Sequence, residues 1–82
     1  MRAFAYPIGE PVNEYGLVEL KEFSISADAA SIRELANFML AAADKMDAMG
    51  EKYDHLHAQD AIKEWDEAWP DLVICGPVKN EL

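Results

Sequence analysis

Apolar residues recur every three or four positions over one long stretch of the chain, from Asp28 to Gly50. This spacing places them along one face of an α-helix, and it differs from the alternation of a strand. Asp28 can cap the first turn, while Ser31 and Glu34 offer a capping box one turn later. Gly50 is the residue type that favours the backbone conformation in which helices end. The apolar stripe comprises Ile32, Leu35, Ala36, Met39, Ala43 and Met46, widened by Phe38, Ala42 and Met49 on one side and by Leu40 on the other.

Two segments before this helix show the alternation of strands. Residues 2–8 predict a short strand, with Pro7 at its edge or in the following turn. Residues 9–16 are rich in turn-forming residues and suit a loop between antiparallel neighbours. Residues 17–26 predict a second strand in which two apolar pairs have opposite phases: Val18 with Leu20, and Phe23 with Ile25. We expect a β-bulge near Lys21–Glu22, the alternative being a change of strand partner at that point.

Shorter elements follow the helix. The segment 55–59 predicts a short strand with both of its histidines on one face, and the apolar run 72–75 predicts an inner strand covered on at least one face. Between them, Asp60 is expected to cap a short second helix over residues 61–69, which Pro70 ends.

The elements indicate one α+β domain over residues 1–82, in the order β-β-α-(β)-α-β, with a loose tail at 77–82. We expect a small, mostly antiparallel sheet of three to four strands, with the long helix packed on one face and a short second helix beside it. A chain of 82 residues supports only one modest core. We therefore expect an exposed working surface or a shallow groove, and no enclosed active site.

The net charge of −9 and the isoelectric point near 4.4 narrow the choice of partners. Residues 44–71 hold nine acidic residues and three lysines, which gives this third of the chain a charge of −6. Such a field repels nucleic acid and anionic membranes, and it speeds encounter with a basic partner. The chain has no apolar run long enough to span a membrane, no secretion signal and a single cysteine, so we expect a cytoplasmic protein.

Few residues suggest a catalytic or metal-binding role. His55 and His57, with Asp60 nearby, have the character of metal ligands, but a closed zinc site needs four ligands. The alternative is that both imidazoles bond to neighbouring acids. Cys75 ends an apolar run without a basic neighbour, which predicts a core residue and not a nucleophile. Neither paired carboxylates in contrasting environments nor a phosphate loop is present, so we expect neither an enzyme nor a cofactor.

Two tryptophans stand out as interface candidates. Trp65 and Trp69 are four residues apart among acids, and tryptophan is over-represented at binding hot spots. The alternative is that at least one of them is buried against the long helix or the sheet.

Several motifs resemble a small bacterial immunity-protein family of polymorphic-toxin systems, the immunity protein 32 type. The resemblance runs from about Leu17 to Pro77, and the segment Asp54–Asp60, D-H-L-H-x-Q-D, is its most specific part. The other matching motifs are L-A-x-F-M on the helix (Leu35, Ala36, Phe38, Met39), D-K-M at residues 44–46, W-D at Trp65 and Asp66, and P-D-L-V-I from Pro70 to Ile74.

The resemblance implies a non-enzymatic antidote that binds a cognate toxin protein and blocks it. An acidic surface suits a basic toxin such as a nuclease. We expect the toxin-facing patch to consist of His55, His57, Asp60, Trp65, Asp66 and Trp69. Two alternatives stay open: a metal- or small-ligand-binding module built on His55 and His57, and a structural protein that dimerises through a sheet edge or its tryptophans. The sequence leaves open whether the chain is a monomer or a homodimer.

Overall fold

The chain forms two small sheets and one long helix. The structure is a computed structural model that describes residues 1–10 and 17–77. Parts of the predicted loop at 9–16 and of the predicted tail at 77–82 lie outside these ranges. The elements in chain order are β1 (Arg2–Pro7), β2 (Leu20–Ser26), α1 (Ala29–Met49), the 3₁₀ turn η1 (Gly50–Lys52), β3 (His55–His57), α2 (Ala58–Ala61) and β4 (Val73–Cys75).

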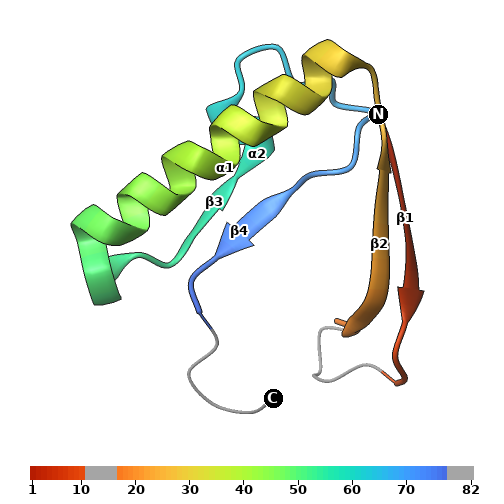
Figure 1. Ribbon diagram of the computed structural model, residues 1–82, viewed down its shortest axis with the longest axis horizontal. Helices are drawn as coiled ribbons and strands as arrows, with labels where there is room; N and C mark the ends of the chain where they lie inside the picture. Colours follow the sequence, from red (N-terminus) through yellow and green to blue (C-terminus); the bar gives the residue numbers. More distant parts are fainter. Residues whose placement is uncertain (11–16, 78–82) are drawn as a thin grey trace.

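The predicted α+β class is confirmed, but the predicted single sheet is wrong. β1 pairs with β2 and β3 pairs with β4, both antiparallel, and these pairs form two separate sheets. Figure 1 shows α1 running alongside β3 and β4, whereas the β1–β2 hairpin projects from the N-terminal end of α1. β1 and β2 contact each other extensively, but they make few contacts with the other elements. The two strand pairs therefore do not join into one sheet.

The expected bulge in the second strand is confirmed. Tyr6 lies opposite Glu22 and Pro7 lies opposite Leu20, so Lys21 has no counterpart in the register of β1. This extra residue shifts the alternation of side chains along β2 by one position. The apolar residues before the bulge and those after it therefore have opposite phases in the sequence.

Both ends of α1 form as their sequence predicts. The Asp28 carboxylate accepts a hydrogen bond from the backbone N–H of Ser31 at 2.8 Å, so Asp28 is the cap and the alternative start at Ser31 is not used. At the other end, the backbone N–H of Gly50 bonds to the carbonyl of Met46. Gly50 has φ 56° and ψ −128°, a conformation that residues with a Cβ rarely adopt.

We expect Gly50→Ala to lower the free energy of unfolding by about 1–3 kcal/mol, the typical cost of a residue held in a sparsely populated backbone conformation. An added Cβ meets no atom within 4 Å at Gly50, so the loss comes from the backbone alone. Gly9→Ala is the matched control, because that position is equally open and its φ is not positive. Urea denaturation compares the two variants, and equal stabilities would refute the backbone argument.

The buried face of α1 is narrower than predicted, and it is displaced around the helix. Leu35, Phe38 and Ala42 are buried, and with Ala58 of α2 they form the core. The expectation that the rest of the stripe is buried is wrong, since Ile32 and Met39 are exposed by about two fifths, and Ala36, Leu40 and Ala43 are exposed too. α2 contacts α1 on this side of the helix, where Phe38 lines a shallow pocket together with Ala61 and Ile62.

The second helix is shorter and earlier than predicted. α2 spans Ala58–Ala61, so Asp60 lies inside it instead of capping it, and His57 is the residue before its first turn. The chain then continues in turns, so neither tryptophan is helical. The Asp66 carboxylate accepts a hydrogen bond from the N–H of Ala68 at 2.8 Å. Such a local bond stabilises a turn in competition with a helix, which explains the failed prediction.

β4 is an edge strand with one covered face. Leu72 and Ile74 are half-buried, while Val73 and Cys75 are exposed, as the alternation of a strand requires. The expected inner strand is therefore wrong in part, and the expected burial of Cys75 is wrong. Cys75 is exposed because it lies on the uncovered face of a two-stranded sheet.

Candidate functional site

The two histidines project from β3 on the same face, as predicted. Their ring centroids are 4.9 Å apart and the ring planes are nearly perpendicular, at 79°. β4 holds β3 in place, since His55 lies opposite Cys75 and His57 lies opposite Val73. The His55 side chain is 44% exposed and that of His57 is 35% exposed, so both imidazoles are accessible to a partner.

Each histidine contacts a carboxylate. The Nδ1 atom of His55 lies 2.7 Å from Asp54 Oδ2, and that of His57 lies 2.5 Å from Asp71 Oδ2. The other oxygen of Asp71 accepts the backbone N–H of Gln59 at 3.1 Å. Asp71 thereby ties the start of α2 to the segment that enters β4. These contacts agree with the interpretation that the imidazoles bond to acids around them, although the sequence alone did not single out Asp71.

Asp71 is the acid in this cluster whose ionisation the fold changes most clearly. Partial burial alone would raise the pKa of Asp71, but hydrogen bonds from His57 and from the backbone N–H of Gln59 outweigh it and hold the pKa below its ordinary value. The ionised carboxylate therefore stabilises the fold. That stability is present above the pKa of the unfolded chain, and it is lost as pH falls through the lower pKa of the folded state.

We expect Asp71→Asn to lower the free energy of unfolding by about 1–3 kcal/mol at pH 7, because the charged acceptor of two hydrogen bonds is lost. The difference from the wild type should shrink as pH falls below about 4, where the wild-type carboxylate also becomes protonated. Urea denaturation between pH 3 and pH 7 measures both effects. Glu64→Gln, at an exposed turn, is the control, and a constant difference at all pH values would contradict the assignment.

The tryptophans form a pair in the turns after α2. Their ring centroids are 5.3 Å apart and the planes are almost perpendicular, at 88°. The backbone N–H of Trp65 bonds to the carbonyl of Ile62, and that of Trp69 bonds to the carbonyl of Asp66. Both side chains are half-buried. Among the described residues, the Trp65 indole nitrogen is the one buried side-chain polar atom without a hydrogen-bond partner.

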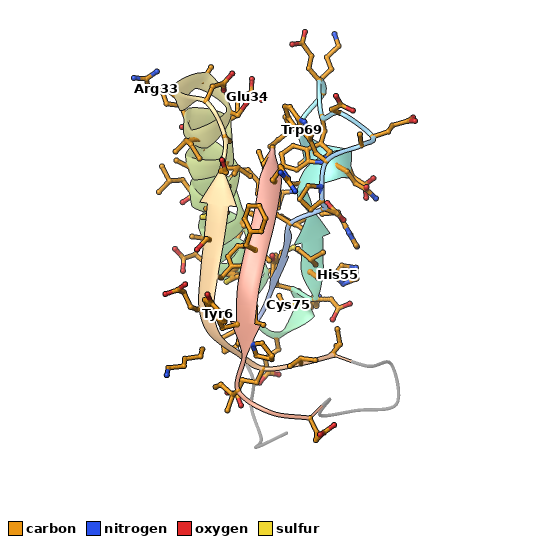
Figure 2. The ribbon with its side chains drawn as sticks, turned by 90° about the vertical axis from the view of Figure 1, so that its right-hand side faces the viewer. Tyr6, Arg33, Glu34, His55, Trp69 and Cys75 are labelled. Carbon is orange, nitrogen blue, oxygen red and sulfur yellow. The ribbon has the colours of Figure 1, made fainter. Side chains whose placement is uncertain are left out.

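The six predicted patch residues fall into two groups on neighbouring elements. His55 and His57 form one group on β3, and the tryptophan pair with Asp66 forms the other, while Asp60 is exposed on α2. The His57–Asp71 contact brings β3 next to the segment that follows Trp69. Figure 2 shows His55 pointing outward beside β3, with Trp69 near the turns above it. No ring contact in the described part of the chain joins the two groups directly.

Acidic residues surround both groups. Eight of the nine acids between residues 44 and 71 have exposed side chains, namely Asp44, Asp47, Glu51, Asp54, Asp60, Glu64, Asp66 and Glu67, while the side chain of Asp71 is partly buried. We call residues 44–71 the acidic segment. Within the ranges 1–10 and 17–77, no group of three histidines, cysteines or acids is arranged to hold a metal ion. The described residues of the acidic segment thus carry exposed carboxylates together with accessible imidazoles and half-buried indoles.

Comparisons with known proteins give one match. The model of a protein family described as Immunity protein 32 matches residues 22–77, which include α1, β3, α2, β4 and most of β2. No curated protein and no solved structure matches the chain. In the described residues, no helix is both long and apolar enough to cross a membrane.

Proposed function

Because the chain belongs to the immunity protein 32 family, we propose that it binds a cognate toxin of its own cell and neutralises it by occupying the toxin's surface. Proteins of this kind generally act without catalysis. The observation that carries the proposal is the family match over residues 22–77, which covers all of the acidic segment. We therefore expect the toxin-binding residues to lie in the elements that the family match covers.

The acidic segment is the proposed toxin-binding surface. Eight of its nine acids are exposed, and its two aromatic groups lie on β3 and in the turns after α2. Aromatic side chains among desolvated charges are the usual anchors of tight protein complexes. Asp60 and Asp66 supply exposed charge at the proposed patch, while Trp65, Trp69, His55 and His57 supply contact area.

A basic toxin fits this surface best. The acidic segment carries −6 of the chain's net charge of −9, and complementary charge accelerates association. Enzymes that act on nucleic acid need positive surface to hold phosphates, so a nuclease domain is the toxin class that the charge favours. An antidote to such a toxin would act in the cytoplasm, where the toxin finds its substrate.

Binding to the product of the adjacent toxin-like gene tests the proposal. We expect the purified chain to capture that protein and to protect cells that produce it. A Trp65→Ala/Asp66→Lys variant should lose capture while circular dichroism shows that α1 remains folded. If the folded variant still captured the toxin as well as the wild type does, these residues would not be part of the binding surface. Failure of the wild-type chain both to bind and to protect would refute the function itself.

A further inference from the structure

The strand β3 holds two imidazoles side by side on one face of its sheet. His55 and His57 are two residues apart in the strand, so their side chains share a face, while Leu56 between them points to the other. Figure 2 shows His55 directed outward from the strand. Both rings are accessible, since their side chains are 44% and 35% exposed. We call His55 and His57 the histidine pair.

The neighbouring carboxylates decide which nitrogen of each ring is available. His55 Nδ1 lies 2.7 Å from Asp54 Oδ2, and His57 Nδ1 lies 2.5 Å from Asp71 Oδ2. Because an ionised carboxylate only accepts hydrogen bonds, each contact places a proton on Nδ1. The Nε2 atom of each neutral ring then carries a lone pair, and no hydrogen bond to the described part of the chain occupies it.

This arrangement is the one that histidine ligands have at metal centres. A metal-bound imidazole almost always donates its other ring N–H to a carboxylate, a carbonyl or water, which fixes the tautomer and raises the basicity of the ligating nitrogen. Both members of the histidine pair have a carboxylate in that position. Asp71 is itself held in place, because its other oxygen accepts the backbone N–H of Gln59 at 3.1 Å.

The separation of the two rings suits a shared ion. Imidazole nitrogens bind Zn²⁺ at about 2.0–2.1 Å, so two rings on one ion have centroids roughly 4.5–5.2 Å apart for bond angles of about 90–109° at the metal. The centroids of His55 and His57 are 4.9 Å apart. Both rings can therefore contact one ion without a change in the backbone of β3.

Charge favours a cation at this face, and the donor atoms select its kind. The acidic segment carries a charge of −6, which raises the local concentration of cations. Imidazole nitrogen suits Zn²⁺, Cu²⁺ and Ni²⁺, whereas Mg²⁺ and Ca²⁺ prefer oxygen ligands. The chemistry of the pair thus points to a transition-metal ion.

We propose that His55 and His57 bind one divalent transition-metal ion such as Zn²⁺ through their Nε2 atoms. Asp54 and Asp71 are positioning residues, which hold the two Nδ1 atoms. The chain supplies two ligands and water fills the other positions, in agreement with the finding that no three histidines, cysteines or acids of the described residues are arranged around a metal. This inference stands whether or not the proposed function is correct, because both ligands belong to this chain.

Calorimetric titration of the chain, purified without an affinity tag, tests the site. We expect one Zn²⁺ per chain with a dissociation constant of roughly 1–100 μM, weaker than at a closed four-ligand site. His55→Ala and His57→Ala should each weaken binding at least ~10-fold, and Asp71→Asn about 10-fold through the lost contact with His57. Cys75→Ser is the matched control, because this exposed thiol lies opposite His55 on β4 and is not a proposed ligand. That variant should bind Zn²⁺ as the wild type does.

Nitrogen NMR of the unmodified chain gives a second test, which does not depend on variant folding. Saturating Zn²⁺ should shift the Nε2 resonances of both histidines much more than the Nδ1 resonances. The absence of both a binding heat and an Nε2 shift would overturn the proposal. Equal losses in Cys75→Ser and His55→Ala would also overturn it, because the thiol would then be a ligand. An affinity for Mg²⁺ equal to that for Zn²⁺ would assign the binding to the acids instead.

Discussion

Replacing Phe38 by alanine should lower the free energy of unfolding by about 3–5 kcal/mol, the usual cost of removing a buried aromatic side chain. In ranges 1–10 and 17–77, Phe38 is the largest of four buried residues, the others being Leu35, Ala42 and Ala58. Phe38 lines a shallow pocket between α1 and the end of α2, together with Ala61 and Ile62. Because small domains have a total stability of about 5–15 kcal/mol, this loss is a large fraction of the whole.

Leu40→Ala is the matched control for this prediction. Leu40 lies on the same helix two residues away, but it is 65% exposed, so truncation should change the stability by about 0.5 kcal/mol or less. Equilibrium urea denaturation, followed by circular dichroism, measures both variants. Equal losses for the two variants would contradict the position of the core described here.

Reversing charge on the acidic segment should slow toxin binding strongly. We expect Asp60→Lys/Asp66→Lys to lower the association rate about tenfold or more at low salt, because long-range attraction governs the encounter of oppositely charged proteins. Both carboxylates are exposed, but Asp66 also accepts the N–H of Ala68 in the turn after α2, so circular dichroism and urea denaturation must first show that the variant keeps the wild-type fold. At high salt the difference should largely disappear, since the Debye length falls to about 3 Å at 1 M. Stopped-flow mixing with the purified toxin domain measures the rates.

A second pair of reversals separates local charge from net charge. Glu10→Lys/Glu19→Lys changes the total charge by the same amount, but both residues are exposed near the hairpin, outside the acidic segment. We expect this variant to bind the toxin at a rate closer to that of the wild type. If both double variants slowed association equally, binding would depend on net charge alone, and the proposed surface would lose its support.

Local signals in the sequence predicted the fold best. The aspartate before α1 and the glycine after it act through contacts within one helical turn, so the sequence placed both ends correctly. The change of phase at residues 21–22 identified the bulge for the same reason. The short strand of the two histidines also formed, with both rings on one face as predicted, although it ends at His57 and not at residue 59.

Features that depend on distant contacts were not predictable. The apolar arc of α1 is wider than the elements that cover it, so periodicity could not show which part is buried. The segment after α2 has helical spacing, but a turn closed by the Asp66 carboxylate replaces the helix. The His57–Asp71 contact spans 14 residues and arises because β3 pairs with β4. The burial of α1 and the His57–Asp71 contact depend on residues far along the chain, whereas the Asp66 turn is a local contact that competes with a helix of the same spacing.

Titration of the purified toxin domain with this chain tests the central claim most directly. If the chain neutralises its toxin by covering it, toxin activity should fall linearly and reach zero at one chain per toxin. Mass spectrometry should then find the toxin covalently unchanged, and activity should return when the complex is dissociated. Complete inactivation by a small fraction of one chain per toxin, or a full equivalent that leaves the activity intact, would contradict the account.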